Sequence, residues 1–324
     1  MTGSPRVSVI LPTYRRPAYL ERAITSVMDQ TVSSWELIIV DDNDPEAPER
    51  FQTEALVESR ASDPRIHYVR HPRNLGGAAA RNTGIGAAKA PYVAFLDDDD
   101  TWHETKLERQ LDRIEAAPSD VALVYCRVRV VMTESGQTGL FRTDGRSPTI
   151  ADLLRRNPIG TTSCVLCRTD AVRRVGGFDA SLPARQDLDL YLRLAQHYAF
   201  AFVDAPLVTL YKHDQPRIST DVEAAILAHE LFACKHKALI ESDPAHIFAE
   251  RRRLGRLLVA AERYRQARPV LLQAIRAKPN DVEALLRFAM TFAPLRVLVG
   301  PTKRLLGLLR GQGRSSLNPL EQEF

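Results

Sequence analysis

The sequence predicts an α/β fold built on a doubly wound, mostly parallel sheet, followed by an all-α C-terminal extension. Short apolar runs alternate with helical segments over the first hundred residues, as in successive βαβ units. Polar or acidic loops follow three of these runs, at residues 12–16, 41–44 and 97–100. Because ligands bind beyond the carboxyl ends of the strands in such a sheet, the three loops predict a binding site at one edge.

The individual elements follow from length and spacing. Seven apolar runs have the length of buried strands: residues 7–11, 35–40, 66–69, 91–96, 121–131, 161–166 and 200–210. Apolar residues at helical spacing predict the helices that connect them: residues 17–30, 47–60, 76–88, 150–156 and 186–194. From Val222 onward the chain is expected to be helical.

The acidic run Asp97–Asp100 stands at the exit of the strand expected over residues 91–96. Four adjacent like charges repel one another, so their placement at a strand end predicts a cation. Mg²⁺ and Mn²⁺ prefer oxygen ligands and are often held by one or two carboxylates, with water and substrate phosphates in the other positions. The alternative is a solvated acidic turn that caps a helix beginning at Thr101.

Length and composition predict a globular protein of two units. The 324 residues are 44% apolar and 26% charged, which suits a packed core. We expect one domain over residues 1–220 and a helical region over residues 221–324. No secretory signal and no run of about 18 apolar residues is evident, which predicts a cytoplasmic protein. The formal charge of +4 is unevenly distributed, because residues 251–314 hold 15 Lys and Arg against three acidic residues.

Two short motifs suggest other chemistry. Cys164 and Cys167 form a CxxC pair, which could bind zinc or exchange disulfides, or could simply be small residues of an apolar strand. Gly84-Ile85-Gly86 is part of a dinucleotide-binding pattern, but it lies within an expected helix and lacks the third glycine. We therefore reject a dinucleotide cofactor.

Six motifs in one order resemble glycosyltransferase family 2 over about residues 6–220. They are Val7 to Tyr14, Ile38 to Asp42, Ala80-Arg81-Asn82-Thr83-Gly84, Phe95 to Trp102, Gly176-Gly177-Phe178-Asp179, and Gln186-Asp187. The resemblance implies a glycosyltransferase A fold. It also implies transfer of a sugar from a nucleoside diphosphate sugar to an acceptor hydroxyl, usually with inversion at the anomeric carbon.

The resemblance also assigns roles to residues. The nucleotide would be bound by Pro12, Thr13, Tyr14, Asp41, Asp42, Arg81, Asp97 and Asp98. Asp41 or Asp42 matches the carboxylate that contacts the base, and Asp97 with Asp99 forms a DxD motif with Asp99 as direct metal ligand. Asp187 matches the catalytic base. His213 is either a metal or phosphate ligand, together with Asp97 and Asp99, or a surface histidine.

The chemistry of the reaction supports two of these roles. The departing nucleoside diphosphate develops negative charge, which Mg²⁺ or Mn²⁺ held by Asp99 would stabilise. An acceptor hydroxyl has a pKa far above neutrality, so it needs a carboxylate such as Asp187 to take its proton. Gln186 stands where the family more often has Glu, and the QxxRW motif of processive synthases is absent, which favours addition of a single sugar.

The sequence patterns of the C-terminal region indicate its structure and function less specifically. Residues 248–281 have the spacing of a single tetratricopeptide-like helix pair, or of a plain helical hairpin. Residues 295–310 alternate apolar and basic residues, which predicts either contact with an anionic membrane surface near a lipid-linked acceptor or a buried helix with extended Arg side chains. Nucleic acid is not expected, because the basic segment lacks interleaved aromatic residues.

The leading hypothesis is a metal-dependent inverting glycosyltransferase that adds one sugar to a glycan or lipid-linked acceptor during assembly of a surface glycan. A nucleotidyltransferase acting on sugar phosphates would use the same carboxylates and metal, but usually with a Gly-rich first loop that residues 12–16 lack. A non-catalytic module that binds sugar nucleotides or proteins is the third hypothesis.

Overall fold

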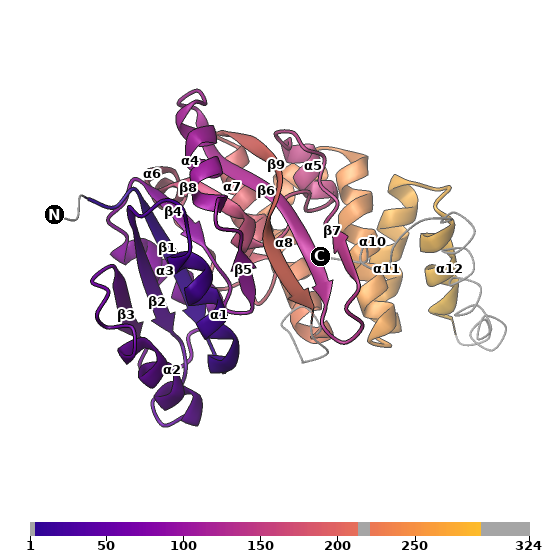
Figure 1. Cartoon of the computed structure of the whole chain (residues 1–324). Helices are drawn as coiled ribbons and strands as arrows, with labels where there is room; N and C mark the ends of the chain where they lie inside the picture. The colour runs from indigo at the N-terminus through magenta and orange to yellow at the C-terminus, as the bar shows by residue number, and fades with distance from the viewer. Residues whose placement is uncertain (1–3, 213–220, 293–324) are drawn as a thin grey trace. The chain divides into compact units, whose positions relative to one another are not determined.

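The computed structural model describes residues 4–212 and 221–292. They divide into two compact units (Figure 1). The first contains residues up to 149, 158–181 and 186–212, and the second contains the C-terminal helices together with residues 150–157 and 182–185. The chain therefore enters the helical unit twice before its C-terminal region begins. His213 and residues 295–310, for which the sequence predicted ligand and membrane contacts, lie outside the described residues.

One sheet forms the centre of the first unit. Its parallel part has the order β3-β2-β1-β4 and comprises β1 (Val7–Thr13), β2 (Trp35–Asp41), β3 (Ile66–Arg70) and β4 (Tyr92–Phe95). Strands β1, β2 and β4 are almost wholly buried, as continuous apolar runs predict. Their carboxyl ends lead into the three loops singled out in the sequence.

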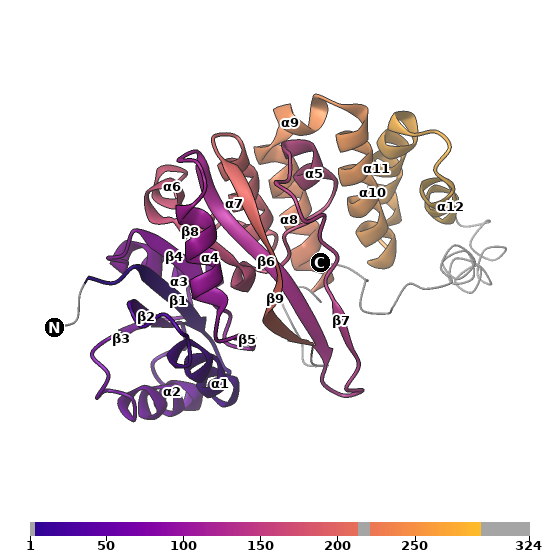
Figure 2. The ribbon, with the colours of Figure 1, turned by 45° about the horizontal axis from the view of Figure 1, so that its top comes forward.

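The sheet continues from β4 as β8-β6-β9-β5, with β7 paired to β6. These strands are β5 (Asp100–Trp102), β6 (Val121–Met132), β7 (Thr138–Leu140), β8 (Val165–Arg168) and β9 (Ala199–Lys212). Strand β8 is antiparallel to both of its neighbours, whereas β6 and β9 are parallel. Figure 2 shows the hairpin of β6 and β7. The sheet is therefore mixed in this half and parallel in the first.

Helices connect these strands. In the first unit they are α1 (Pro17–Met28), α2 (Pro48–Glu58), α3 (Gly77–Ala87), α4 (Lys106–Glu115), α6 (Thr169–Arg174) and α7 (Gln186–Ala195). Pro17 and Pro48 begin α1 and α2, where the missing N–H costs nothing. In α3, a Cβ at Gly84 would lie 2.4 Å from Cγ2 of Ile10, so only glycine allows the helix to approach β1 this closely.

Two local expectations were wrong. Residues 161–166 were expected to be one strand, but Thr162–Cys164 form a short 3₁₀ helix, η1, and β8 begins at Val165. The segment after the acidic run was alternatively expected to begin a helix at Thr101. It forms β5, which pairs with β9, and α4 begins only at Lys106. Residues Asp97–Asp100 therefore cap no helix.

The CxxC pair belongs to the core. Cys164 and Cys167 are buried and free, and burial raises the pKa of both thiols. Within residues 4–212 and 221–292, no group of three or more His, Cys, Asp or Glu is arranged to hold a metal ion. Burial agrees with the interpretation of both cysteines as small apolar residues, although only Cys167 lies in a strand, β8, and Cys164 ends η1.

The helical unit contains α5 (Ile150–Arg155), α8 (Val222–Lys235), α9 (Lys237–Glu241), α10 (Pro244–Ala260), α11 (Tyr264–Ala277) and α12 (Val282–Met290). Its core includes Leu254, Leu258 and Leu271. A Cβ at Gly255 would lie 2.4 Å from Cδ2 of Leu271, so α10 and α11 pack in close contact. The two helices occupy the predicted hairpin, and a tetratricopeptide-like role stays a prediction. Among the described helices, none has the length and apolarity needed to cross a bilayer.

Candidate active site

Arg81 lies between two predicted site carboxylates. It projects from α3, and its Nη2 donates to Oδ1 of Asp97 at 2.5 Å, just beyond β4. Its Nη1 makes a longer contact, 3.5 Å, with Oε1 of Gln186 at the start of α7. Burial alone would lower the pKa of Arg81, but the charges of Asp97 and Asp187 hold it above its usual value. The fold therefore brings the acidic run and the expected base to one guanidinium.

The acidic run alternates between buried and accessible side chains. Asp98 and Asp100 are buried, whereas the side chains of Asp97 and Asp99 are 28% and 14% exposed. Oδ2 of Asp98 accepts hydrogen bonds from Thr13 Oγ1 at 2.9 Å and from the backbone N–H of Tyr14 at 3.3 Å. Asp98 thus ties the first loop to the acidic run, and the two ends of the DxD motif are the carboxylates left accessible.

Asp98 has an unusual environment for a carboxylate. Its burial, together with the charge of Asp99, raises its pKa to about 7, although Arg16 and the hydrogen bonds from the first loop act in the opposite direction. Arg16 Nη1 lies 2.7 Å from Oδ2 of Asp99 and 3.4 Å from Oδ1 of Asp98. Arg16 was not among the site residues predicted from the sequence. The only indication was its positive charge, in a loop expected at the same edge of the sheet as the acidic run.

The donor set fits a hard divalent cation. Asp97 and Asp99 are partly exposed carboxylates two residues apart, and one or two such ligands suffice for Mg²⁺ or Mn²⁺ when phosphates complete the shell. Arg16 and Arg81 each hold one of these carboxylates in place. The two arginines also carry the positive charge that binding of a diphosphate requires.

Besides Arg81, three hydroxyl groups contact Asp97. Thr161 and Thr162 donate to its carboxylate at 3.3 to 3.4 Å. Ser163 accepts from the backbone N–H of Asp97 at 3.1 Å and donates to Oδ2 of Asp100 at 2.6 Å. The sequence assigned these residues to a strand, and three consecutive hydroxyl residues were the available signal of a different role.

The carboxylates after β2 are enclosed by hydrogen bonds. Oδ1 of Asp41 accepts from the N–H and Nδ2 of Asn43, and its Oδ2 accepts from Tyr68 OH at 2.5 Å. Asp42 is bonded to His71 Nδ1 at 2.7 Å and to two backbone N–H groups, those of Leu75 and Gly76. Both carboxylates therefore organise the loops of the expected base pocket.

His71, which the sequence did not single out, connects two of the site elements. Its Nε2 lies 2.9 Å from Thr83 Oγ1 on α3, while its Nδ1 contacts Asp42. A hydrogen-bonded histidine between the loop after β2 and the helix of Arg81 fixes their relative positions. No spacing of residues in the sequence would have identified it.

The Gly-Gly-Phe-Asp motif meets the Arg-Asn motif through Asn82. Asn82 Nδ2 donates to the carbonyl of Phe178 at 2.7 Å, and the N–H of Phe178 donates to Asn82 Oδ1 at 2.8 Å. Gly177 has a φ of +66°, and a Cβ there would lie 2.5 Å from Asn82 Oδ1. Only glycine allows this reciprocal pairing, which fixes the chain that leads toward α7.

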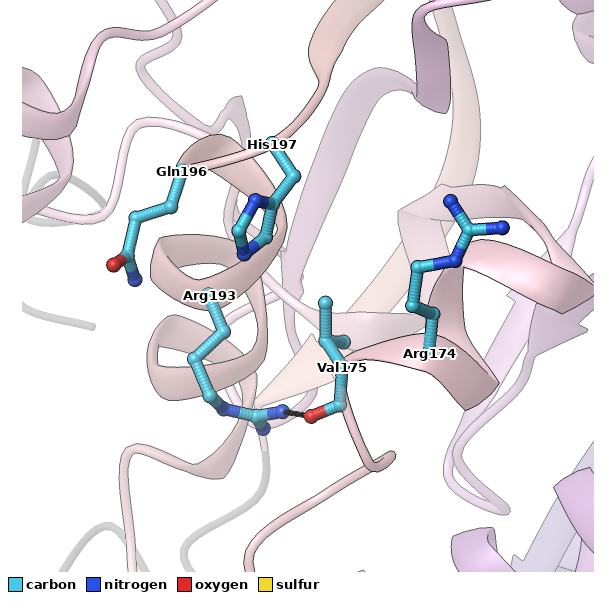
Figure 3. A pocket seen from close by; sticks show the side chains of 5 residues that line it. All are labelled: Arg174, Val175, Arg193, Gln196 and His197. Carbon is cyan, nitrogen blue, oxygen red and sulfur yellow. Dashed lines mark hydrogen bonds between the residues drawn. The ribbon is translucent and has the colours of Figure 1, made fainter.

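The hollow in Figure 3 is separate from these carboxylates. It is lined by Arg174, Val175, Arg193, Gln196 and His197. Arg193 donates to the carbonyl oxygens of Val175 at 2.5 Å and Gly177 at 2.6 Å, and it pairs with the fully buried Asp189. These contacts give Arg193 a structural role in holding α7.

The fold and the arrangement of carboxylates define a glycosyltransferase with a glycosyltransferase A fold. The chain belongs to glycosyltransferase family 2, because the family model described as Glycosyl transferase family 2 matches residues 8–176. The family predicted from the sequence motifs is thereby confirmed, and with it the assignment as an enzyme.

Named relatives support this assignment. TuaG of Bacillus subtilis (strain 168), whose name places it in teichuronic acid biosynthesis, is 34% identical over 59% of this chain and 72% of its own length. The amylovoran biosynthesis glycosyltransferase AmsB of Erwinia amylovora is 32% identical over 60% of this chain and 65% of its own. WfgD of Escherichia coli, a UDP-Glc:alpha-D-GlcNAc-diphosphoundecaprenol beta-1,3-glucosyltransferase, is 28% identical over 66% and 80%.

Solved structures share the fold at low sequence identity. S. aureus TarS 1-349 in complex with UDP-GlcNAc has a TM-score of 0.58 and 16% identity, covering 96% of this chain and 93% of TarS 1-349. The mannosyltransferase PcManGT from Pyrobaculum calidifontis, in complex with GDP-Man and Mn²⁺, has a TM-score of 0.55 and 19% identity, with coverages of 95% and 81%. These likenesses confirm the predicted fold class.

Proposed function

We propose that this protein is a metal-dependent, inverting glycosyltransferase that moves one sugar from a nucleoside diphosphate sugar to an acceptor hydroxyl in surface polysaccharide assembly. The observation that carries the proposal is the position of Arg81, whose guanidinium is bonded to Asp97 and stabilised by the charge of Asp187. Inverting transfer needs a carboxylate that takes the proton of the acceptor hydroxyl and a cationic site that binds the diphosphate. The two must lie close enough for one sugar to fit between them.

The donor would be held by its diphosphate. Asp97 and Asp99 are the residues that would hold Mg²⁺ or Mn²⁺, which when bound neutralises the charge that develops on the leaving diphosphate. Arg16 and Arg81 bind and orient the phosphate oxygens beside these carboxylates. The binding of GDP-Man with Mn²⁺ by PcManGT supports the same donor chemistry here.

The base of the nucleotide would lie against the loops after β1 and β2, formed by Pro12, Thr13, Tyr14 and the Asp41-Asp42 pair. The contact with the base is Asp41 or Asp42, because the two carboxylates have the same pattern of hydrogen bonds. Each has two partners at Oδ1 and one at Oδ2, so Oδ2 of either carboxylate keeps capacity for a base N–H.

Asp187 would take the proton of the acceptor hydroxyl as the oxygen attacks the anomeric carbon. It lies in the first turn of α7, where the helix dipole favours a charged carboxylate, and Arg81 adds a cation. Names of the relatives, including a diphosphoundecaprenol acceptor for WfgD, support a glycan or lipid-linked acceptor. Peripheral contact with the cytoplasmic face of a membrane stays a prediction from residues 295–310.

The experiment compares wild type with Asp187→Asn. A thermal-shift panel of UDP- and GDP-sugars with Mn²⁺ selects the donor, and release of nucleoside diphosphate from that donor measures turnover. We expect the variant to bind the nucleoside diphosphate as wild type does and to lose about 100-fold or more in turnover. Unchanged turnover would refute the assignment of the base.

Two other outcomes would identify the alternative functions. Release of pyrophosphate from a nucleoside triphosphate and sugar phosphate would identify a nucleotidyltransferase. Binding without turnover in wild type would identify a binding module.

A further inference from the structure

The chain passes from the helical unit to the catalytic unit immediately before the proposed base. Residues 182–185 belong to the helical unit, whereas Gln186 begins α7 in the catalytic unit. Asp187 is thus two residues beyond Arg185, the last residue of this inserted segment. Any restraint on Arg185 acts on the start of α7 through a single peptide unit.

Arg185 is held tightly within the helical unit. Its Nη1 and Nη2 lie 2.7 and 3.0 Å from the two carboxylate oxygens of Glu250, in the bidentate geometry that gives arginine a fixed orientation. Its guanidinium carbon lies 3.9 Å from the ring centroid of Phe232. Glu250 and Phe232 are 1% and 0% exposed, so solvent does not compete for these contacts.

His229 completes the cluster. Its Nδ1 lies 2.6 Å from Oε1 of Glu250 and 2.7 Å from Nη1 of Arg185. Burial opposes ionisation of Glu250, but the charge of Arg185 and the hydrogen bond from His229 hold its pKa below the usual value. Glu250 is therefore ionised near neutral pH, and it forms a charged pair with Arg185 on the inside of the helical unit.

The backbone at Arg185 also requires this restraint. Arg185 has a φ of +62°, a left-handed conformation that is unfavourable for a residue with a Cβ. The contacts with Glu250 and Phe232 offset that cost. The first turn of α7 follows directly, so the left-handed residue sets the direction in which the chain enters the helix of Asp187.

A second segment of the helical unit, residues 150–157, also precedes residues of the site. The chain that leaves this segment reaches Thr161 and Thr162, which donate to Asp97. Arg253 on α10 donates to the carbonyl oxygens of Leu154 and Arg155. The helical unit thus holds the chain shortly before two separate groups of site residues.

We propose that Arg185 is a positioning residue: its contacts with Glu250, His229 and Phe232 hold the left-handed backbone from which α7 begins, and this backbone sets the direction of Asp187 on the first turn. This inference rests on the proposed function. The C-terminal helices then serve turnover rather than binding of the donor, because the nucleotide contacts lie on other loops. A misplacement of the base by about 1 Å can cost on the order of 100-fold in rate.

The test uses the full chain and the double variant Arg185→Met/Glu250→Gln. Removing both charges avoids the uncompensated buried charge that a single substitution leaves. The matched control is Glu223→Gln, which breaks the exposed pair between Glu223 and Arg263 in the same unit. Measurements are the melting temperature, the Kd for UDP or GDP with Mn²⁺, and kcat for nucleoside diphosphate release from the donor selected by the panel.

We expect the double variant to fold, to bind the nucleoside diphosphate within about twofold of wild type, and to lose about 10- to 100-fold in kcat. Arg185→Lys, which keeps the charge but not the bidentate geometry, should give an intermediate kcat, and Glu223→Gln should match wild type. Wild-type kcat in the double variant, an equal loss of binding and kcat, or failure to fold would each overturn the inference. If Asp187→Asn loses turnover while the double variant does not, the proposed function stands and this inference fails.

Discussion

Arg81 Nη2 donates to Asp97 Oδ1 at 2.5 Å, which joins a helix of the first βαβ units to the first carboxylate of the acidic run. The two residues are 16 positions apart in the chain. Their pairing holds the partly exposed carboxylate of Asp97, and the charge of Asp187 also acts on the same guanidinium. The same guanidinium therefore affects the proposed diphosphate site and the proposed base.

Replacing Arg81 tests the first of these effects. In Arg81→Gln, Asp97 and Asp187 lose a common cation, so the site becomes more negative and repels a diphosphate. We expect the Kd for UDP or GDP with Mn²⁺ to rise about 10- to 100-fold, the value of a charged hydrogen bond. Titration calorimetry measures it. Arg113→Gln, at an exposed position of α4, is the control, and equal affinities of the two variants would contradict the prediction.

Replacing Asp99 tests the proposed metal site. Asp99→Asn keeps the size of the side chain and removes a charged oxygen ligand, so the Mn²⁺ concentration needed for half-maximal stabilisation by nucleoside diphosphate should rise at least about tenfold. Chelation with EDTA should abolish that stabilisation in wild type. Asp112→Asn on the exposed face of α4 controls for loss of one negative charge. A metal requirement that is unchanged in Asp99→Asn would exclude Asp99 as a ligand.

Two glycines of α3 provide a matched pair for stability. Gly84→Ala places a Cβ 2.4 Å from Ile10 Cγ2 and should lower the free energy of unfolding by about 1–3 kcal/mol through overpacking. Gly86 is exposed and has no atom within 4 Å of an added Cβ, so Gly86→Ala should raise it by about 0.5–1 kcal/mol. Urea denaturation of both variants measures the difference. Effects of the same sign would contradict the close contact of α3 with β1.

Lys106 makes the free energy of unfolding depend on pH in the alkaline range. It is fully buried, with Nζ 2.7 Å from Gln110 Oε1 and 3.8 Å from the ring centroid of Trp102. Burial lowers its pKa from 10.5 to about 8. Between these values the unfolded chain holds a proton that the folded protein has released, so the contribution of Lys106 to the free energy of unfolding rises with pH.

We expect that rise to total about 3 kcal/mol between pH 8 and 10.5. The measurement is the difference in free energy of unfolding between wild type and Lys106→Met across this range, since other groups contribute similarly to both. Wild type should gain relative to the variant as pH rises. A constant difference would mean that Lys106 titrates in the folded protein as it does in the unfolded chain.

Much of the catalytic unit could be predicted from local sequence. Continuous apolar runs identified β1, β2 and β4, because strands covered on both faces must be apolar throughout. The order of the strands beyond β4 could not be predicted, because insertion of β8 between β4 and β6 depends on pairing between distant segments. The alternative interpretation, a helix beginning at Thr101, was wrong for the same reason, since pairing with β9 made that segment a strand.

The site shows the same division. Asp97, Asp99, Arg81 and Asp187 could be proposed from the sequence because short motifs contain the residue types that diphosphate chemistry requires. Residues that support them, such as Arg16, His71 and Thr162, were missed because each acts through a neighbour that is distant in sequence. No spacing records such a contact.

The sequence by itself determined the family and the α/β class, because apolar periodicity and short motifs are local properties of the chain. Only the tertiary structure decided which carboxylates face inward and which remain accessible in the acidic run. It also decided that Arg185 belongs to the helical unit, by burying Glu250 opposite its guanidinium. Burial and pairing depend on residues brought together by folding, so the energies that fix the positions of the site residues are absent from any local pattern.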